Sequence, residues 1–94
     1  EIAKTIVSQI GNFSLSMIGT KKIYGIERGC MIRLSCRGAK ANLIKIQLNG
    51  LDLYDIEFHM ERAGKCKEVA IVNDVYCDQL HDMIETHTGL YTRL

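Results

Sequence analysis

The middle of the chain alternates apolar and polar residues in three consecutive segments, and this alternation constrains the fold more than any other feature of the sequence. The segments cover residues 30–36, 43–48 and 53–60. Successive side chains of a β-strand point to opposite faces, so a period of two predicts strands that bury one face and expose the other. Polar turns separate the segments, which favours antiparallel pairing of neighbouring strands.

Shorter segments predict further strands on both sides of these three. Residues 13–17 alternate apolar residues with two serines and predict a half-buried strand. Residues 23–26 predict a short strand, in which Gly25 indicates a bulge or a close backbone approach. Residues 69–72 predict either a short strand or an extended lead-in to a helix. The pair Asn49-Gly50 predicts a hairpin turn, because both residue types tolerate positive φ.

Helical spacing of apolar residues marks the two ends of the chain. Residues 2–10 place isoleucine and valine on one helical face, and Gly11 is the expected end of that helix. A second helix is predicted after Asn73 or Asp74, either of which is a favourable N-cap. Gly89 stands where a helix ends in a left-handed residue.

The predicted fold is therefore a single α+β domain spanning residues 1–94. An antiparallel sheet of four or five strands carries an N-terminal and a C-terminal helix on one face, and the other face meets water or a partner. A chain of 94 residues has no room for a second core. Its apolar runs are too short for a membrane span and its beginning has no signal-peptide pattern, so we expect a cytoplasmic protein without membrane contacts.

Charge is divided unevenly along the sequence. Residues 21–45 contain seven basic residues and one acid, whereas residues 46–94 contain four basic residues and nine acids. The middle of the chain is thus +6 and the C-terminal half −5, although the whole chain is only +1. Such asymmetry can steer a charged partner or make the protein pair with itself head to tail. Alternatively, the two halves neutralise each other within one molecule.

Two groups of charged residues are candidate binding surfaces. An acidic row at helical spacing would fit a basic groove on a partner protein, although it is also typical of the solvent-facing side of a helix. The members of this row are Asp74, Asp78, Asp82 and Glu85. A basic group in the predicted turns would suit nucleic acid, or only keep the turns polar. The members of the basic group are Lys21, Lys22, Arg28, Arg37 and Lys40.

One strand carries a set of residues that would suit a divalent metal. Asp55, Glu57 and His59 alternate, so they share a face, and Lys45 across the predicted hairpin would complete a nuclease-like group. The alternative is a solvated face whose acids form cross-strand pairs with Lys45 and Arg33. We favour the solvated face.

Cysteine and histidine give a weaker indication of zinc. Cys77 and His81 lie four residues apart and would present two ligands from one helix, with Cys66 or His87 completing the site. The alternative is a core cysteine beside a boundary histidine, and no C-x-x-C pair is present. Phosphate-binding, metalloprotease and nucleophile motifs are also missing, so we expect no metal, no cofactor and no enzymatic activity.

Several segments resemble a group of small phage and prophage proteins. The chain reads LDLYDIEF at residues 51–58, DVYCDQL at 74–80 and TGLYT at 88–92. The opening IGNF at residues 10–13 is similar as well, and IGTKK at 18–22 is a looser match. The resemblance implies a phage protein made in the cytoplasm of a bacterium, and it carries no catalytic or binding residues with it.

These observations favour a non-enzymatic binding protein. The leading hypothesis is an inhibitor or modulator of a host protein, such as a defence protein, that acts through charged contacts. A nucleic-acid-binding accessory protein that uses the basic turns is the alternative, and a metal-dependent nuclease is a third hypothesis. A homodimer formed through the uncovered sheet face or a strand edge is compatible with each of them.

Overall fold

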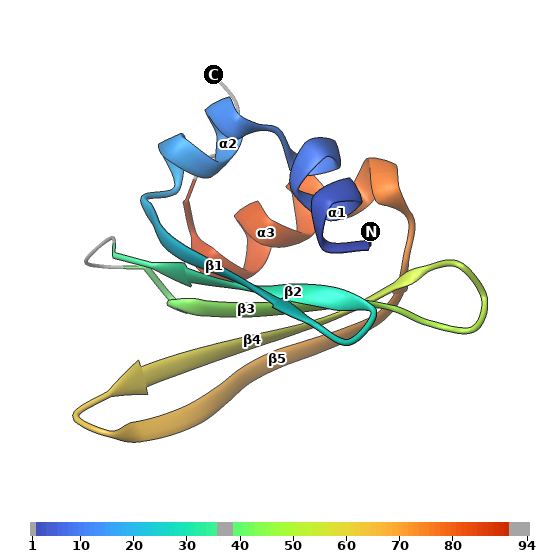
Figure 1. Cartoon of the computed structure of the whole chain (residues 1–94). Helices are drawn as coiled ribbons and strands as arrows, with labels where there is room; N and C mark the ends of the chain where they lie inside the picture. The colour runs from blue at the N-terminus through green and yellow to red at the C-terminus, as the bar shows by residue number, and fades with distance from the viewer. Residues whose placement is uncertain (1, 36–38, 91–94) are drawn as a thin grey trace.

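Five antiparallel strands form one meander, and the helices lie on one of its faces (Figure 1). The computed structural model describes residues 2–35 and 39–90. The sheet has the order β1-β2-β3-β4-β5, which confirms the predicted α+β architecture with both terminal helices on one side. In chain order the elements are α1 (Ile2–Ile10), α2 (Asn12–Met17), β1 (Thr20–Ile26), β2 (Gly29–Leu34), β3 (Leu43–Leu48), β4 (Tyr54–Arg62), β5 (Lys65–Val75), the 3-10 turn η1 (Cys77–Gln79) and α3 (Leu80–Thr88).

Cross-strand pairing decides which side chains face the helices. Ile32 of β2 pairs with Ile44 of β3, which pairs with Phe58 of β4, and none of the three is exposed to solvent. Directly paired residues share a face of the sheet, so this row forms part of the core floor. The helices close the core from above with Ile6, Ile10, Leu15, Leu80 and Ile84.

The prediction of a strand over residues 13–17 is wrong, because this segment forms the short helix α2. Gly11, at φ 92°, separates α2 from α1. Ser14, Leu15 and Ile18 are buried, whereas Phe13 is 63% exposed. The burial therefore follows the helical spacing of Ser14 and Ile18 and not the alternation that places Phe13 with Leu15.

The turn at Asn49-Gly50 is also longer than predicted. The connection between β3 and β4 continues to Leu53, and its residue with positive φ is Asp52, at 61°. The cause is the side chain of Asn49, whose Oδ1 accepts hydrogen bonds from the backbone N–H groups of Leu51 (2.8 Å) and Leu53 (3.2 Å). The backbone thus folds around this side chain, as in an Asx turn.

The strand β5 is much longer than the predicted 69–72, and it includes both proposed N-cap residues, Asn73 and Asp74. Asp74 has φ 58° at an irregularity of the β4–β5 ladder. The C-terminal helix begins later, and the backbone N–H of Tyr76 donates to Oε1 of Gln79 at 3.2 Å. Its end is as predicted, because Gly89 has φ 75° and its N–H donates to the carbonyl of Glu85.

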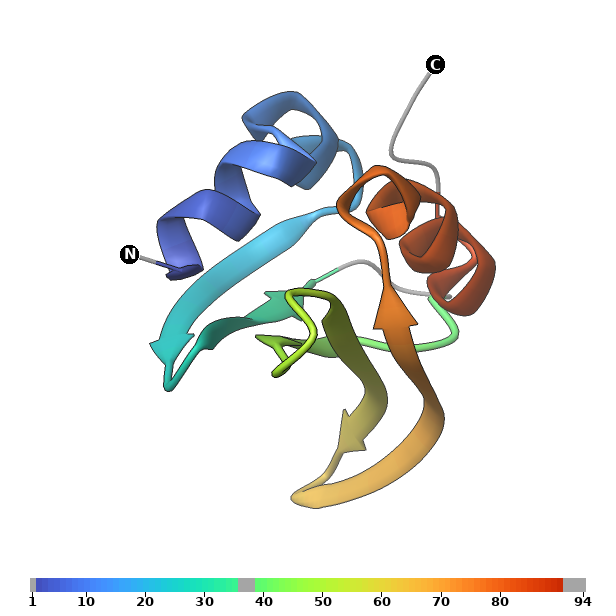
Figure 2. The ribbon, with the colours of Figure 1, turned by 90° about the vertical axis from the view of Figure 1, so that its right-hand side faces the viewer.

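The far end of the β4–β5 hairpin projects past the helices (Figures 1 and 2). A tight turn at Ala63 and Gly64, both at positive φ, joins the two strands. No residue between Met60 and Val69 is buried or packs against the core, so this part of the hairpin is held by its own ladder. Across the described ranges, 2–35 and 39–90, none of the helices is long and apolar enough to cross a membrane.

Candidate binding surfaces

The face of the sheet opposite the helices carries charged and apolar side chains side by side. One row of directly paired residues crosses all five strands on this face, and it consists of Tyr24, Met31, Lys45, Glu57 and Ile71. Tyr24 and Ile71, at the two edges, are 41% and 50% exposed. The Lys22 ammonium lies 5.3 Å from the centre of the Tyr24 ring. We refer to this surface as the open face.

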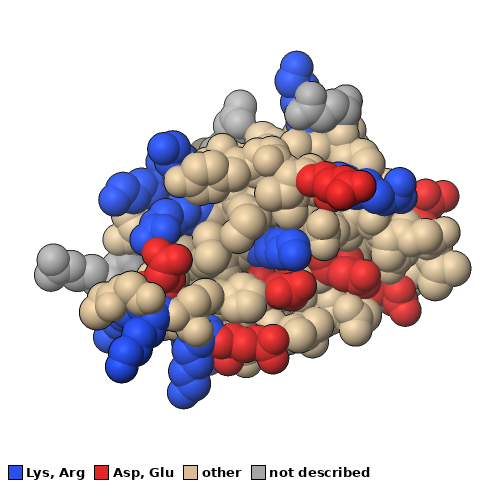
Figure 3. All heavy atoms as spheres, turned by 60° about the horizontal axis from the view of Figure 1, so that its bottom comes forward, with Lys and Arg blue, Asp and Glu red and all other residues tan. Residues whose placement is uncertain are grey.

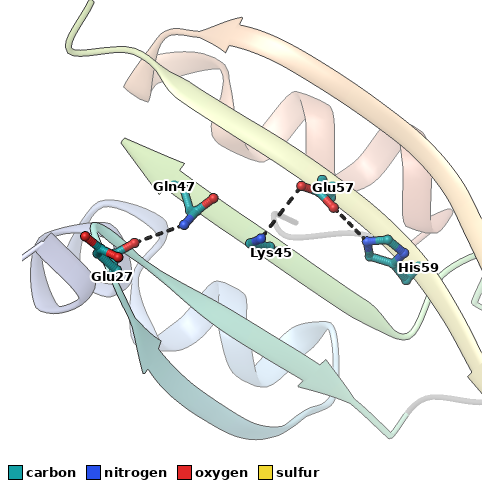
Figure 4. Close-up of polar contacts among 5 residues, drawn as sticks. All are labelled: Glu27, Lys45, Gln47, Glu57 and His59. Carbon is teal, nitrogen blue, oxygen red and sulfur yellow. Dashed lines mark hydrogen bonds and ion pairs between the residues drawn. The ribbon is translucent and has the colours of Figure 1, made fainter. Parts of the chain in front are cut away.

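The predicted metal ligands do not act as a set. Figure 4 shows Glu57 between two neighbours, with its Oε1 3.0 Å from Nε2 of His59 and its Oε2 3.9 Å from Nζ of Lys45. Asp55 turns instead toward Asn49, whose Nδ2 donates to Asp55 Oδ1 at 3.0 Å. Within the described ranges no three His, Cys, Asp or Glu side chains are grouped to hold a metal ion.

The cross-strand pairs expected on the open face are present in part. Lys45 faces Glu57 as expected, but Arg33 forms its ion pair with Glu61, at 2.7 Å. Figure 4 also shows Gln47, whose Nε2 donates to the backbone carbonyl of Glu27 at 3.0 Å. The open face therefore compensates much of its own charge.

The residues considered for zinc are dispersed. Cys77 lies in η1 just beyond the end of β5, whereas Cys66 lies near the beginning of that 11-residue strand. The ring of His87 packs on Phe58, with 4.8 Å between ring centroids. Cys77 and His81 lie in the adjoining elements η1 and α3, but no group of three candidate ligands forms around them in the part of the chain that the structure describes.

The acidic row is divided among three elements. Asp82 and Glu85 lie on α3, Asp78 lies in η1, and Asp74 lies in β5. The prediction of one continuous helical stripe is therefore wrong for Asp74, because the helix begins after it. The Asp74 carboxylate accepts a hydrogen bond from Nδ2 of Asn49 at 2.8 Å.

The basic turn residues are likewise at different places. Lys21 and Lys22 are exposed at the beginning of β1, whereas Arg28 is in the turn after β1, where its Nε donates to the carbonyl of Leu48 at 3.1 Å. The Lys40 side chain lies over Gly89 on the helix side of the sheet. Arg37 lies outside the described residues.

Charge is instead sorted between the two ends of the sheet. Antiparallel pairing places the beginning of β1 at the same end as the tip of the β4–β5 hairpin. We call this the basic end, because its exposed charged residues include one acid, Glu68, and five bases, which are Lys21, Lys22, Arg62, Lys65 and Lys67. The opposite, acidic end carries one exposed base, Arg28, and four exposed acids, which are Glu27, Asp52, Asp74 and Asp78. In Figure 3 most Lys and Arg spheres gather at the left, and most Asp and Glu spheres lie over the centre and right.

A groove separates α1 from β1. It has a volume of about 460 Å³, and it is lined by Ala3, Lys4, Val7, Ser8, Gly11, Ile23 and Gly25. A volume of this size is within the range of small-ligand and side-chain pockets. The sequence reasoning missed this groove and the basic hairpin tip. The available signal was the second face of the first helix, where Ala3 and Val7 lie at helical spacing beside Lys4 and Ser8.

The described cysteines divide into one buried and two exposed thiols. Cys30 is fully buried, and burial raises the pKa of its thiol from 9.0 to about 11. Cys66 and Cys77 are exposed. Burial also raises the pKa of Tyr54, whose hydroxyl donates to Oε1 of Gln9 at 2.6 Å. Cys36 lies outside the described residues.

Comparison with known proteins assigns no family. The chain matches no protein-family model, no curated protein and no solved structure.

Proposed function

We propose that this chain is a non-enzymatic binding protein that occupies a basic surface of another protein with its acidic end and the adjoining side of α3. The observation that carries the proposal is the sorting of charge between the two ends of the sheet (Figure 3). The residues proposed to bind are Asp74, Asp78, Asp82 and Glu85.

The arrangement suits a partner with a basic groove. Asp78 and Asp82 are exposed, and they belong to consecutive turns of η1 and α3. Opposite charge across an interface accelerates association and rejects partners of the wrong sign. A basic groove that ordinarily holds nucleic acid is the kind of surface that such a row of carboxylates would occupy.

The similarity to small phage proteins supplies a context for this proposal. A phage protein that occupies the basic groove of a host protein would inhibit or modulate that protein, and a host defence protein is a natural target. The site of action would be the bacterial cytoplasm.

The proposal is tested by capturing partners from bacterial lysate with the tagged chain, in parallel samples with and without nuclease treatment. Wild type should retain a stoichiometric protein, and the Asp78→Lys/Asp82→Lys variant should release it, because repulsion replaces attraction at the contact. We expect a loss of affinity of about tenfold or more.

A matched control reverses two charges of the other sign at the far end of the molecule. The Lys65→Glu/Lys67→Glu variant should keep the partner. Retention of the partner by Asp78→Lys/Asp82→Lys, or its equal loss from both variants, would contradict the proposed surface.

The basic end favours a second candidate function, that of a nucleic-acid-binding accessory protein. Five exposed basic side chains of β1 and the hairpin tip lie at this end. The same capture experiment separates the two functions. Nucleic acid held by wild type, released by high salt and lost from Lys65→Glu/Lys67→Glu, would support the accessory protein and contradict binding through the acidic end.

A further inference from the structure

The groove between α1 and β1 lies on a surface that the proposed function does not use. We infer that it binds an extended, acidic segment of a partner protein, which pairs with the outer edge of β1 and places an apolar side chain between α1 and β1. Three observations lead to this inference: an uncovered strand, an open strand edge and an excess of positive charge.

The helix layer stops short of β1. Ile23 pairs with Ile32 and Gly25 pairs with Cys30, so all four residues face the helix side of the sheet. Ile32 and Cys30 are fully buried, whereas Ile23 is 38% exposed and Gly25 is exposed. A strip of the helix-facing surface therefore remains bare along β1.

This strip forms one wall of the groove. The other wall is α1, which packs against β2 and presents Ala3 and Val7 toward the opening. A Cβ built at Gly25 meets nothing within 4 Å, so the space above this residue is open. The lining is mixed, with the apolar side chains of Ala3 and Val7 beside the polar side chains of Lys4 and Ser8, and the volume of about 460 Å³ suits one or two side chains.

The outer edge of β1 provides the backbone contacts. β1 is the first strand in the sheet order, and within the described residues it pairs only with β2. An edge strand presents N–H and C=O groups that can pair with an added strand. Extended peptides commonly bind in this way, with main-chain hydrogen bonds along the edge and alternate side chains in pockets beside it.

Charge selects the chemistry of the added segment. α1 and β1 contain three lysines, Lys4, Lys21 and Lys22, and no acidic residue. All three lysines are exposed, and Lys4 lines the groove itself. A segment that alternates acidic and apolar residues would match both the lysines and the apolar part of the groove, whereas a nucleic-acid backbone would match the lysines alone.

The test uses the full chain and a displayed library of random decapeptides. Peptides that alternate acidic and apolar residues should be enriched, and one of them, made synthetically with a fluorescent label, is the probe for affinity. Gly25→Val should weaken binding of this peptide by about tenfold or more, because the added side chain fills the groove. Valine favours β-strands, so the substitution should not disrupt β1 itself. Lys4→Glu, an exposed change on α1, should weaken it similarly.

The matched control is Tyr24→Val, which changes the same strand on its other face. This variant should bind within about twofold of wild type, since its groove is unchanged. Circular dichroism and melting temperature establish that each variant is folded. Hydrogen exchange of the wild-type complex should show new protection of amides in Thr20–Ile26 and none in β5.

Several results would overturn the inference. They are the absence of acidic–apolar peptides from the selection, full affinity in both Gly25→Val and Lys4→Glu, or protection confined to β5. Dissociation of a wild-type dimer by Gly25→Val would identify a second copy as the occupant and would also overturn it. The outcome is independent of the Asp78→Lys/Asp82→Lys experiment, so either proposal can fail alone.

Discussion

At the scale of single residues, Cys30 shows how the core controls ionisation. It lies on β2 between its paired neighbours Gly25 and Ile46, and it is fully buried under the helices. Burial disfavours the thiolate and raises the pKa of the thiol from 9.0 to about 11. Between these pH values the unfolded chain has lost a proton that the native chain still holds.

This difference predicts a specific loss of stability in alkali. The contribution of Cys30 is complete below pH 9 and is lost as the pH rises toward 11, because the unfolded state then binds fewer protons than the native state. The free energy of unfolding should fall by roughly 2–3 kcal/mol from this group across that interval. Tyr54, with its raised pKa, adds a loss of the same sign at higher pH.

Urea unfolding of wild type and Cys30→Ala at pH 8, 9, 10 and 11 measures the effect. The variant should be less stable at pH 8, because it leaves a small cavity, but its stability should depend less steeply on pH. Parallel slopes for the two proteins would contradict the assignment to Cys30.

At the scale of elements, two glycines of the first hairpin illustrate opposite constraints. A Cβ on Gly29 would overlap the carbonyl oxygen of Ile46 and lie 2.8 Å from Cα of Gln47. Both are backbone atoms of β3, so β2 and β3 can approach here only because residue 29 has no side chain. A Cβ on Gly25 meets nothing within 4 Å.

We therefore expect Gly29→Ala to destabilise the fold by about 3 kcal/mol, because the strands must separate locally. Gly25→Ala should be neutral or stabilising by up to roughly 1 kcal/mol, since it reduces the freedom of the unfolded chain. Chemical denaturation of the two variants side by side gives the comparison. Equal stability of the two would show that the β2–β3 spacing adapts to the added methyl group.

The strands that sequence reasoning identified correctly are those with one buried face. Apolar and polar residues alternate along β2, β3 and β4, because one face of each strand packs in the core and the other lies on the open face. The first half of β5 is exposed on both faces, so it has no alternation to detect. Residues 13–17 alternate by coincidence, since the buried Ser14 follows the helix spacing and Phe13 does not.

At the scale of the whole molecule, the surfaces depend on how elements are placed. The open face and its paired charges could be expected from the alternation of apolar and polar residues. The charge asymmetry could be expected from the numbers of basic and acidic residues in each part of the sequence. Its sorting into two ends depends on strand order, and the groove depends on the position of α1 relative to β1. Neither follows from a local pattern alone. The turn composition groups the basic residues together, although strand pairing places Arg28 and Lys21 at opposite ends of β1.

Both edges of the sheet carry lysines, and these should oppose pairing between copies of the chain. β1 has Lys21 and Lys22, β5 has Lys65 and Lys67, and each edge ladder also contains an irregularity. Lysines and bulges on edge strands prevent edge-to-edge association. On β1 the same lysines would still admit an acidic segment.

Replacing the β5 lysines should therefore promote association. We expect Lys65→Val/Lys67→Val to form larger species than wild type in size-exclusion chromatography with light scattering. The control is Lys45→Val, which removes a lysine from the internal strand β3 and should elute as wild type does. An unchanged mass for the double variant would show that the bulges alone protect this edge.

The projecting end of the β4–β5 hairpin should unfold locally and independently of the core beneath the helices. Because no residue between Met60 and Val69 is buried or packs against the core, unzipping this tip exposes little apolar surface. The tip can fray and re-form many times while the layer beneath the helices stays intact. Insertions at Ala63-Gly64 would likewise leave the core unchanged, so the hairpin is the part of this fold most free to change its length during evolution.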